Sequence, residues 1–333
     1  MGTSPIWLTE ADVTASIDLV SAIDTLEDVL VAEISQQAAN MPKTHLMVGE
    51  NNAMHALGGA IHSLRVCGTK TWVNIDGKSS TMILLFSLVD GSCLAAIEST
   101  ALGQIRTAAM SGLGTRWLSD TNVTEMAIIG TGKQALPQIA ACVAVRPLSV
   151  VKVFSRQAKK RQALVSEINI EFPDIEVVNC DNLKEATRDV PLITLCTNST
   201  VPFFNANMAS QGAHINAVGA IVPSRVEFTE DVLMRCTTVA VDTLVGVQKL
   251  SQEFISHYEN GDGDWNQVLS MSQVIHERYE RPLDTDLTLF KPMGMGIADI
   301  AIAKVVLDKN LDNKKVHTLP ERQRQKLPHV GVK

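Results

Sequence analysis

The residues with the most specific spacing are the small ones of Gly130-x-Gly132-x-x-Ala135, within the stretch EMAIIGTGKQA. A short apolar run, Met126–Ile129, precedes them and is typical of a buried strand, and helix-compatible residues follow. In this pattern the first glycine makes a tight turn, the second lets a phosphate approach bare backbone, and the small third residue lets the helix pack on its strand. With a strand before it and a helix after it, the pattern predicts a dinucleotide-binding turn.

The residues after the next expected strand indicate which dinucleotide is bound. That strand, Val150–Phe154, ends in Ser155-Arg156, and no Asp or Glu occurs from residue 132 to residue 166. A site that prefers NAD usually has an acid there, which holds the ribose 2′-hydroxyl. A 2′-phosphate instead needs hydroxyl donors and cations, which Ser155, Arg156 and Lys159 can supply. We therefore predict that NADPH is preferred, with NADH possible. One or two members of the basic cluster are expected to form a solvated helix face: Lys159, Lys160 and Arg161.

Three basic residues in apolar segments of the first half are candidates for binding a second ligand. Lys43 lies in MPKTHLM, Lys70 in CGTKTWVN and Arg106 in LGQIRTAAMSG. A buried cation needs an anionic partner. In a pocket that partner can be a substrate carboxylate, which an arginine grips with two parallel hydrogen bonds. Each residue could equally form a structural ion pair or lie at the surface, so residue chemistry alone leaves the three roles open.

Length and composition exclude several classes of protein. The 333 residues predict one large or two ordinary domains, and 45% hydrophobic content allows a sizeable core. A net charge of -7 argues against nucleic acid or an anionic membrane as a partner. No apolar run reaches the roughly 18 residues of a membrane span, and MGTSPIWLTE does not resemble a signal peptide. We expect a cytoplasmic protein with free thiols, no metal site, and a largely aliphatic pocket because aromatic content is 4%.

The two halves of the chain predict an α/β protein with two kinds of sheet. Residues 1–120 contain strand-like runs separated by Asp76-Gly77 and Asp90-Gly91, pairs typical of β-hairpins, so we expect an α+β domain with an antiparallel sheet. From residue 121 to about 305 strands alternate with helices, which predicts a doubly wound parallel sheet. A helix over 99–119 should join the halves. The expected strands are Met126–Ile129, Val150–Phe154, Leu192–Thr197, His214–Val218 and Val239–Val241.

Several stretches together resemble the ornithine cyclodeaminase/μ-crystallin family. ALGQIRTAAMSGLGTRWL directly precedes MAIIGTGKQA, and VKVFSR, GAHINAVGA and LFKPMGMGIADIAIA follow in the family's order. The resemblance covers about residues 40–305 and implies a homodimer. Residues 1–120, joined by about 306–333, would form the substrate-binding and dimerisation domain, and residues 121–305 the NAD(P)-binding Rossmann domain.

The resemblance also implies roles for single residues. Lys70 would be the catalytic residue, and Lys43 would stand where the family commonly has a carboxylate-binding arginine. The implied substrate-binding residues are Lys43, Lys70, Arg106 and Met293. The implied cofactor-binding residues are Arg106, Gly130, Thr131, Gly132, Lys133, Gln134, Ala135, Ser155, Arg156, Lys159, Thr197, Asn198, Asn216, Val218, Gly219, Arg225 and Pro292.

One departure from the family separates its activities. Ornithine cyclodeaminases carry an Asp after the fifth strand of the Rossmann domain, whereas this chain has Ile221, which cannot accept a proton. The sequence therefore favours NAD(P)H-dependent reduction of a small cyclic imine carboxylate: Δ1-pyrroline-2-carboxylate to L-proline, with Δ1-piperideine-2-carboxylate to L-pipecolate as a second reaction. The alternatives are an alanine dehydrogenase-like or ornithine cyclodeaminase-like enzyme, and a non-catalytic NADPH-binding protein resembling μ-crystallin.

Overall fold

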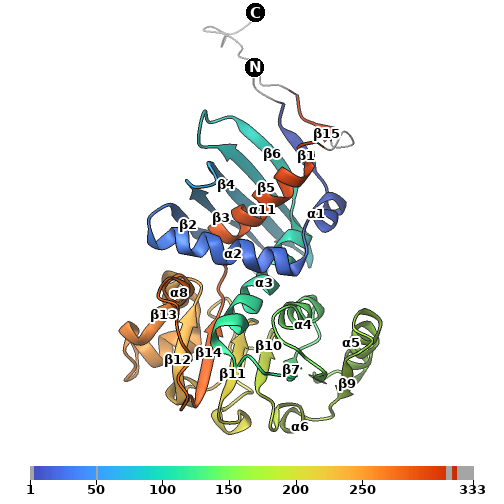
Figure 1. The fold of residues 1–333 in the computed structure, drawn as a ribbon, viewed down its shortest axis with the longest axis vertical. Helices are drawn as coiled ribbons and strands as arrows, with labels where there is room; N and C mark the ends of the chain where they lie inside the picture. Colours follow the sequence, from blue (N-terminus) through green and yellow to red (C-terminus); the bar gives the residue numbers. More distant parts are fainter. Residues whose placement is uncertain (1–3, 50–51, 313–316, 321–333) are drawn as a thin grey trace, which may run out of the picture.

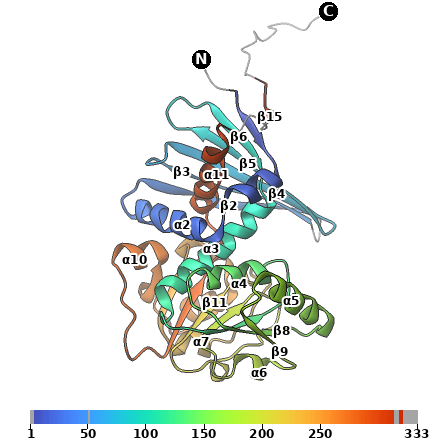
Figure 2. The ribbon, with the colours of Figure 1, turned by 45° about the vertical axis from the view of Figure 1, so that its right-hand side comes forward.

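The computed structural model describes residues 4–49, 52–312 and 317–320, which form two domains, one above the other in Figures 1 and 2. The upper domain holds a mixed sheet and the lower domain a parallel sheet, each with helices packed on it, which confirms the predicted α/β fold class. Helix α3, Thr100–Leu118, contacts both and is the helix predicted to join the halves. Within the described residues, no helix combines the length and apolar character needed to span a bilayer.

The first domain is built on a seven-stranded sheet in the order β15-β1-β6-β5-β4-β3-β2. Neighbours from β2 to β6 are antiparallel, whereas β1 runs parallel to β6. Asp76 and Gly77, both with positive φ, turn β4 into β5, and Asp90-Gly91 lies between β5 and β6, so both predicted hairpins are confirmed. The strands are β1 (Ile6–Leu8), β2 (Ala38–Val48), β3 (Asn52–Ile61), β4 (Val66–Ile75), β5 (Lys78–Ser87), β6 (Cys93–Glu98) and β15 (His317–Thr318).

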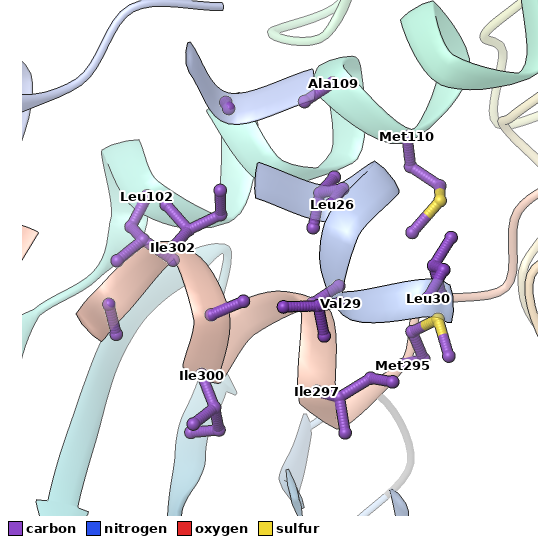
Figure 3. Packing of buried hydrophobic residues seen from close by; sticks show 14 of the residues in the cluster. Leu26, Val29, Leu30, Leu102, Ala109, Met110, Met295, Ile297, Ile300 and Ile302 are labelled. Carbon is purple, nitrogen blue, oxygen red and sulfur yellow. The ribbon is translucent and has the colours of Figure 1, made fainter. Parts of the chain in front are cut away.

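Three helices pack together over one face of this sheet, and their apolar side chains form its core (Figure 3). Leu26, Met110 and Ile300 come from a different helix each and lie in the same buried cluster. The last helix approaches the strands closely, because a Cβ atom on Gly68 would lie 2.9 Å from Ile300 Cδ1. The helices are α2 (Leu19–Ile34), α3 and α11 (Gly296–Asn310), and a shorter α1 (Glu10–Ser16) precedes them.

Helix α11 belongs to the first domain, which differs from the predicted domain boundary. Its buried residues, Ile297 among them, lie in the core of the first domain, and it contacts β3, β4 and α2. The chain therefore returns to the first domain near residue 295 rather than at about residue 306. The prediction failed because a helix after a Rossmann strand has the same pattern whichever sheet it covers. Of the predicted return over 306–333, residues 313–316 and 321–333 lie outside the described residues.

The second domain is an eight-stranded parallel sheet in the order β13-β12-β14-β11-β10-β7-β8-β9. Strand β7 pairs with both β8 and β10, so the chain winds outward from β7 in two directions. Such a reversal leaves a crevice at the carboxyl edge of the sheet, where ligands bind in folds of this kind. The strands are β7 (Glu125–Ile129), β8 (Val150–Phe154), β9 (Glu176–Asn179), β10 (Leu192–Leu195), β11 (Ala213–Ala217), β12 (Cys236–Val241), β13 (Val268–Ser270) and β14 (Leu287–Lys291).

All five predicted strands of this domain are present, to within a few residues at their ends, and three further strands were not predicted: β9, β13 and β14. The helices of the domain are α4 (Ala135–Val143), α5 (Ala158–Glu171), α6 (Leu183–Thr187), α7 (Asp231–Arg235), α8 (Leu244–Leu250), α9 (Gln252–Phe254) and α10 (Met271–His276). Short 3-10 or π turns lie at Ala206–Met208, Ile255–Glu259 and Trp265–Gln267.

The carboxyl end of α3 is fixed by one buried arginine. Arg146 is 7% exposed, and its guanidinium donates to the carbonyl oxygens of Thr115 (2.7 Å), Arg116 (2.8 Å) and Ser119 (3.1 Å). A helix leaves its last carbonyls without partners, and a cation there also compensates the helix dipole. Arg146 follows α4, so these bonds attach the Rossmann domain to the helix that enters it.

We expect Arg146→Met to lower the free energy of unfolding by about 2–4 kcal/mol, because the buried carbonyls of α3 lose their donors. Urea denaturation followed by circular dichroism measures this. The matched control is Arg188→Met, whose side chain is 76% exposed, for which the change should stay within about 0.5 kcal/mol. Equal stability of the two variants would contradict the capping role.

Candidate active site

A cavity of about 770 Å³ lies between the two domains, at the carboxyl edge of β7 and β10. Its walls come from β2, β3, β4 and α3 of the first domain and from α6 and the loops after β7, β8, β10, β11 and β14 of the second. This is the crevice expected where the strand order reverses. The volume lies within the range of small-molecule and cofactor sites. The cavity brings together the basic residues of the first half and the glycine turn of the second.

The glycine turn has the geometry that a pyrophosphate needs. Gly130 has φ 119°, and a Cβ atom there would lie 2.6 Å from the carbonyl oxygen of Cys196. A Cβ atom on Gly132 would meet nothing within 4 Å, so its backbone faces open space. Thr131, Lys133 and Gln134 also line the cavity. Ala135 is buried in the apolar cluster beneath α4, which fits packing between helix and strand rather than contact with a ligand.

The residues after β8 lie beside the glycine turn in the cavity, and one of the basic residues among them differs from the prediction. Ser155, Arg156 and Lys160 line it, whereas Lys159 does not. Thr131 Oγ1 donates to Ser155 Oγ over 3.2 Å, which links the glycine turn to this loop. Along α5, neighbouring residues point in directions about 100° apart, which fits Lys160 lining the cavity while Lys159 does not. Sequence alone did not fix which of the two faces inward.

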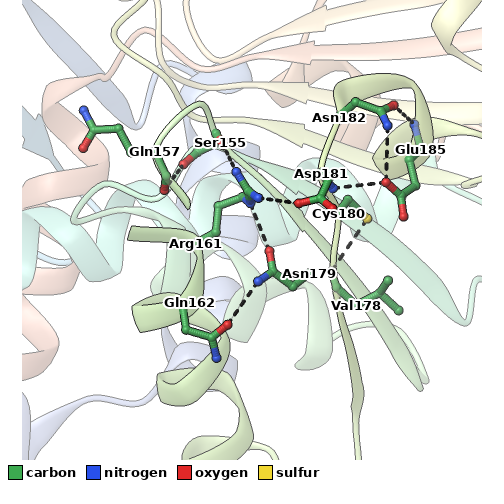
Figure 4. A network of polar contacts seen from close by, with 10 residues as sticks. All are labelled: Ser155, Gln157, Arg161, Gln162, Val178, Asn179, Cys180, Asp181, Asn182 and Glu185. Atoms are coloured by element: carbon green, nitrogen blue, oxygen red, sulfur yellow. Dashed lines mark hydrogen bonds and ion pairs between the residues drawn. The ribbon is translucent and has the colours of Figure 1, made fainter. Parts of the chain in front are cut away.

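Arg161 has a structural role, as the network in Figure 4 shows. It is 6% exposed and donates from Nη1 to the carbonyl oxygen of Ser155 (2.9 Å), from Nε to Asn179 Oδ1 (3.0 Å) and from Nη2 to Asp181 Oδ1 (2.8 Å). It therefore holds the end of β8 against the loop after β9 and is not part of a solvated helix face. Among the described residues that line the cavity there is no Asp or Glu.

Glu227, which the sequence did not single out, holds the loops after β10 and β11 together. One carboxylate oxygen accepts from the N–H of Thr197 (2.7 Å), and the other accepts from the N–H groups of Gly219 (2.7 Å) and Ala220 (3.2 Å). Burial raises the pKa of Glu227, while the Lys291 charge and these donors oppose the shift. The loops that Glu227 joins carry predicted cofactor residues that line the cavity: Thr197, Asn198, Val218, Gly219 and Arg225.

Asn216 lies elsewhere than predicted. It is fully buried within β11, donates to Thr115 Oγ1 over 2.8 Å, and its side-chain oxygen lies 3.2 Å from His214 Nε2. Asn216 thus connects the Rossmann sheet to α3 and is not among the cavity-lining residues. The cavity is lined by Val218 and Gly219, which follow the end of β11, whereas Asn216 lies inside the strand.

The three basic residues of the first half do meet in the cavity. Lys70 is 7% exposed and Arg106 is 9% exposed, and both contact one buried carboxylate oxygen, Asp299 Oδ1, at 2.9 Å from Lys70 Nζ and 3.2 Å from Arg106 Nε. Lys43 is half-buried, and its ammonium lies 5.8 Å from the centre of the Trp72 ring. Burial lowers the pKa of Lys43, and the Arg106 charge lowers it further. Burial also lowers the pKa of Lys70, against the opposing effect of Asp299.

A second buried carboxylate, Asp242, supports the wall opposite these cations. It accepts from the N–H groups of Met293 (2.8 Å) and Gly294 (2.7 Å). Gly294 has φ 91°, and a Cβ atom there would lie 3.4 Å from Arg106 Nη1. Burial raises the pKa of Asp242, and the two N–H donors oppose that shift. The turn carries Pro292 and Met293, which line the cavity.

The remaining lining residues decide what the site can do. Ile221 lines the cavity, so the side chain at this position of the wall is apolar and cannot accept a proton. The wall is not as aliphatic as predicted, because Trp72 lines it and stacks on His55 with ring centres 4.7 Å apart. Across the described residues, no group of three His, Cys, Asp or Glu side chains could hold a metal ion. The arrangement can bind an anion at one end, a dinucleotide at the other, and supply a proton from Lys70.

Comparison with known proteins decides the family. Residues 4–314 match the sequence profile of the ornithine cyclodeaminase/mu-crystallin family. This chain belongs to that family. A Δ(1)-pyrroline-2-carboxylate reductase of Bacillus cereus is 30% identical over 233 residues, which are 69% of this chain and 71% of that protein.

Solved structures of the family have the same fold. The Thermococcus litoralis Δ(1)-pyrroline-2-carboxylate reductase in complex with NADH and L-proline superposes with a TM-score of 0.89 at 22% identity, over 94% of this chain and 100% of that one. An archaeal alanine dehydrogenase dimer with bound NAD gives a TM-score of 0.88 at 24% identity, over 96% of this chain and 99% of that one. Both superpositions extend over the two domains and confirm the fold.

Proposed function

We propose that this protein is an NAD(P)H-dependent reductase that converts a small cyclic imine carboxylate to the corresponding cyclic amino acid, foremost Δ1-pyrroline-2-carboxylate to L-proline. The observation that carries the proposal is the meeting of Lys43, Lys70 and Arg106 in one cavity with the glycine turn, with the apolar Ile221 also in its wall. The 30% identity to a Bacillus cereus enzyme of that name supports the same substrate class. The six-membered homologue, Δ1-piperideine-2-carboxylate, is proposed as a second substrate.

The residues of the cavity suit each part of this reaction. When bound, the nicotinamide supplies a hydride to the imine carbon. The electron pair of the C=N bond then moves to nitrogen, which takes up one proton. Lys70 can donate it, because its ammonium is within the cavity and burial lowers its pKa toward neutrality. Arg106 and Lys43 bind the carboxylate, and Trp72 with Met293 forms apolar wall beside it. The neutral Lys70 regains its proton from solvent.

Lys70→Ala should lower kcat with the cyclic imine by about 10²- to 10⁴-fold, the usual contribution of a positioned general acid. Affinity for the reduced cofactor should change by less than about 3-fold, because Lys70 belongs to β4 of the first domain and the glycine turn to the second. Initial rates of NADPH oxidation and fluorescence titration with NADPH measure the two effects. Unchanged turnover in this variant would show that Lys70 is not the proton donor. Wild-type turnover of pyruvate and ammonia in place of the imine would favour an amino-acid dehydrogenase instead.

We also propose that NADPH is preferred over NADH. Two observations support this: Arg156 and Lys160 line the cavity beside Ser155, and no acid is present among the described lining residues to repel a 2′-phosphate. The Thermococcus litoralis structure contains NADH, so related sites accept the unphosphorylated cofactor. The free thiols at all six cysteines agree with a cytoplasmic location, which we propose as well.

Arg156→Ala should raise KM for NADPH by about 10-fold, because it removes a charge-assisted contact to the 2′-phosphate, and should leave KM for NADH nearly unchanged. Helix α5 offers a matched pair of lysines, since Lys160 lines the cavity and Lys159 does not. Lys160→Ala should therefore raise KM for NADPH more than Lys159→Ala does. Steady-state kinetics with both cofactors tests this. Equal loss of NADPH and NADH affinity in Arg156→Ala would refute a 2′-phosphate contact.

We propose further that the protein is a homodimer that buries the face of the first-domain sheet opposite α11. Apolar side chains on that face remain exposed in the single chain: Met41, Leu46, Met54 and Leu84. Strand β2 is a long edge strand with exposed apolar residues, a surface that proteins normally cover. A second copy of this chain suits the face because such a contact pairs identical patches.

Leu84→Lys should shift the protein from dimer to monomer, because it places a charge within the proposed apolar contact. Light scattering coupled to size exclusion gives the mass. Ile170→Lys is the matched control, since Ile170 is 81% exposed on α5 of the other domain and should leave the dimer intact. A wild-type monomer at micromolar concentration would overturn the proposed dimer.

A further inference from the structure

Asp299 is the one carboxylate that both buried cations of the active site contact. It lies on α11 and has no exposed surface, Lys70 comes from β4, and Arg106 comes from α3. A single oxygen, Oδ1, takes both contacts, at 2.9 Å from Lys70 Nζ and 3.2 Å from Arg106 Nε. The other oxygen, Oδ2, is buried and has no hydrogen-bond partner among the described residues. Asp299 does not line the cavity, so it acts on a ligand through the two cations.

The Lys70 ammonium lies against a glycine of α3, which has no side chain to occupy the same space. A Cβ atom on Gly103 would lie 2.8 Å from Lys70 Nζ, so any larger residue there would displace the ammonium from its contact with Asp299. Gly103 and Arg106 are three residues apart on the helix and therefore lie on the same face. The face of α3 that presents Arg106 is thus also the face that leaves room for Lys70.

The charges around Lys70 oppose one another. Arg106 from α3 and Lys43 from β2 are cations that disfavour a third positive charge, and burial disfavours it more strongly. Asp299 from α11 opposes these effects on Lys70, while Asp242 lies nearer to Lys43 and Arg106. Burial raises the pKa of Asp299, but the Arg106 and Lys70 charges outweigh it and lower that pKa overall, so the carboxylate stays ionised. A buried cation keeps its charge through such a paired anion.

We propose that Asp299 is the positioning residue of this site: it holds the Lys70 ammonium and the Arg106 guanidinium in one arrangement and keeps Lys70 protonated for donation to the substrate nitrogen. The inference rests on the proposed imine reduction for its chemistry, but the ion pairs on which it is based do not depend on the substrate. In the reaction Lys70 gives up one proton and becomes neutral. The Asp299–Arg106 pair then remains, and its carboxylate favours return of the proton from solvent to Lys70.

The test is Asp299→Asn, which preserves size and removes the charge. The protonated lysine is the active form, so activity falls as pH rises through the Lys70 pKa, and loss of Asp299 should lower that pKa further. The alkaline limb of the kcat profile should therefore move to lower pH by about one unit or more, so that kcat on the alkaline side of both limbs is reduced about 10-fold or more. Affinity for NADPH should stay within about 2-fold of wild type. An alkaline limb that does not move would overturn the proposal.

The matched control is Asp308→Asn on the same helix, where the carboxylate pairs with Lys304 near the surface. Its pH profile should equal that of the wild type. Gly103→Ala is the second variant, for use if Asp299→Asn does not fold, because alanine favours the helix while its methyl group displaces Lys70 Nζ. Its alkaline limb should move in the same direction, and a wild-type profile in Gly103→Ala would also contradict the proposal.

A measurement without substrate separates this inference from the proposed function. The rate at which an amine-reactive acylating reagent modifies Lys70, followed by peptide mass spectrometry across pH, reports the neutral amine directly. In Asp299→Asn the midpoint should move to lower pH by about one unit or more. If the wild-type protein turns over no imine but this shift is observed, the proposed reaction fails while the role of Asp299 stands. If imine reduction is observed and no shift occurs in labelling, the role of Asp299 fails alone.

Discussion

The packing of one helix on two sheets is the constraint on which the rest of the structure depends. Helix α3 packs beside α2 and α11 in the core of the first domain, and it also packs on α4, β11 and β14 of the second. Helix α3 lies very close to β14, since a Cβ atom on Gly114 would lie 2.5 Å from the ring of Phe290. Because the helix is rigid, the distance between Arg106 and the glycine turn at Gly130 is fixed by packing far from either residue.

The cations buried at the domain boundary need anionic partners. The fold supplies two carboxylates, which come from different elements. Asp299 comes from the helix that returns to the first domain, and Asp242 from the loop after β12. A buried charge is tolerated only where its partner is also held in place. The site therefore does not belong to either domain alone. Its basic residues come largely from one half of the sequence, and the acids that stabilise them come from the other.

How far the sequence predicted the structure depended on whether a pattern was local. The glycine turn between a strand and a helix, and the hairpins at Asp76-Gly77 and Asp90-Gly91, follow from neighbouring residues and were confirmed. Strand β14 was missed, and its position between β11 and β12 depends on sheet order that no local pattern records. Lys43, Lys70 and Arg106 could be named from the sequence, because a cation in an apolar segment stands out. Asp299 could have been named in the same way, because it is an acid within the apolar segment GIADIA.

The early return of the chain at α11 has a mechanical consequence. The Rossmann domain is inserted into the first domain and is joined to it at two places, α3 and the segment after Lys291, rather than by one flexible linker. A body attached at two points can rotate only about the line through them. Such a rotation would change the cavity least beside the two connections, where Pro292 and Met293 on one and Arg106 on the other line it. Ligand entry would then change the width of the dinucleotide end far more than the spacing of the cations.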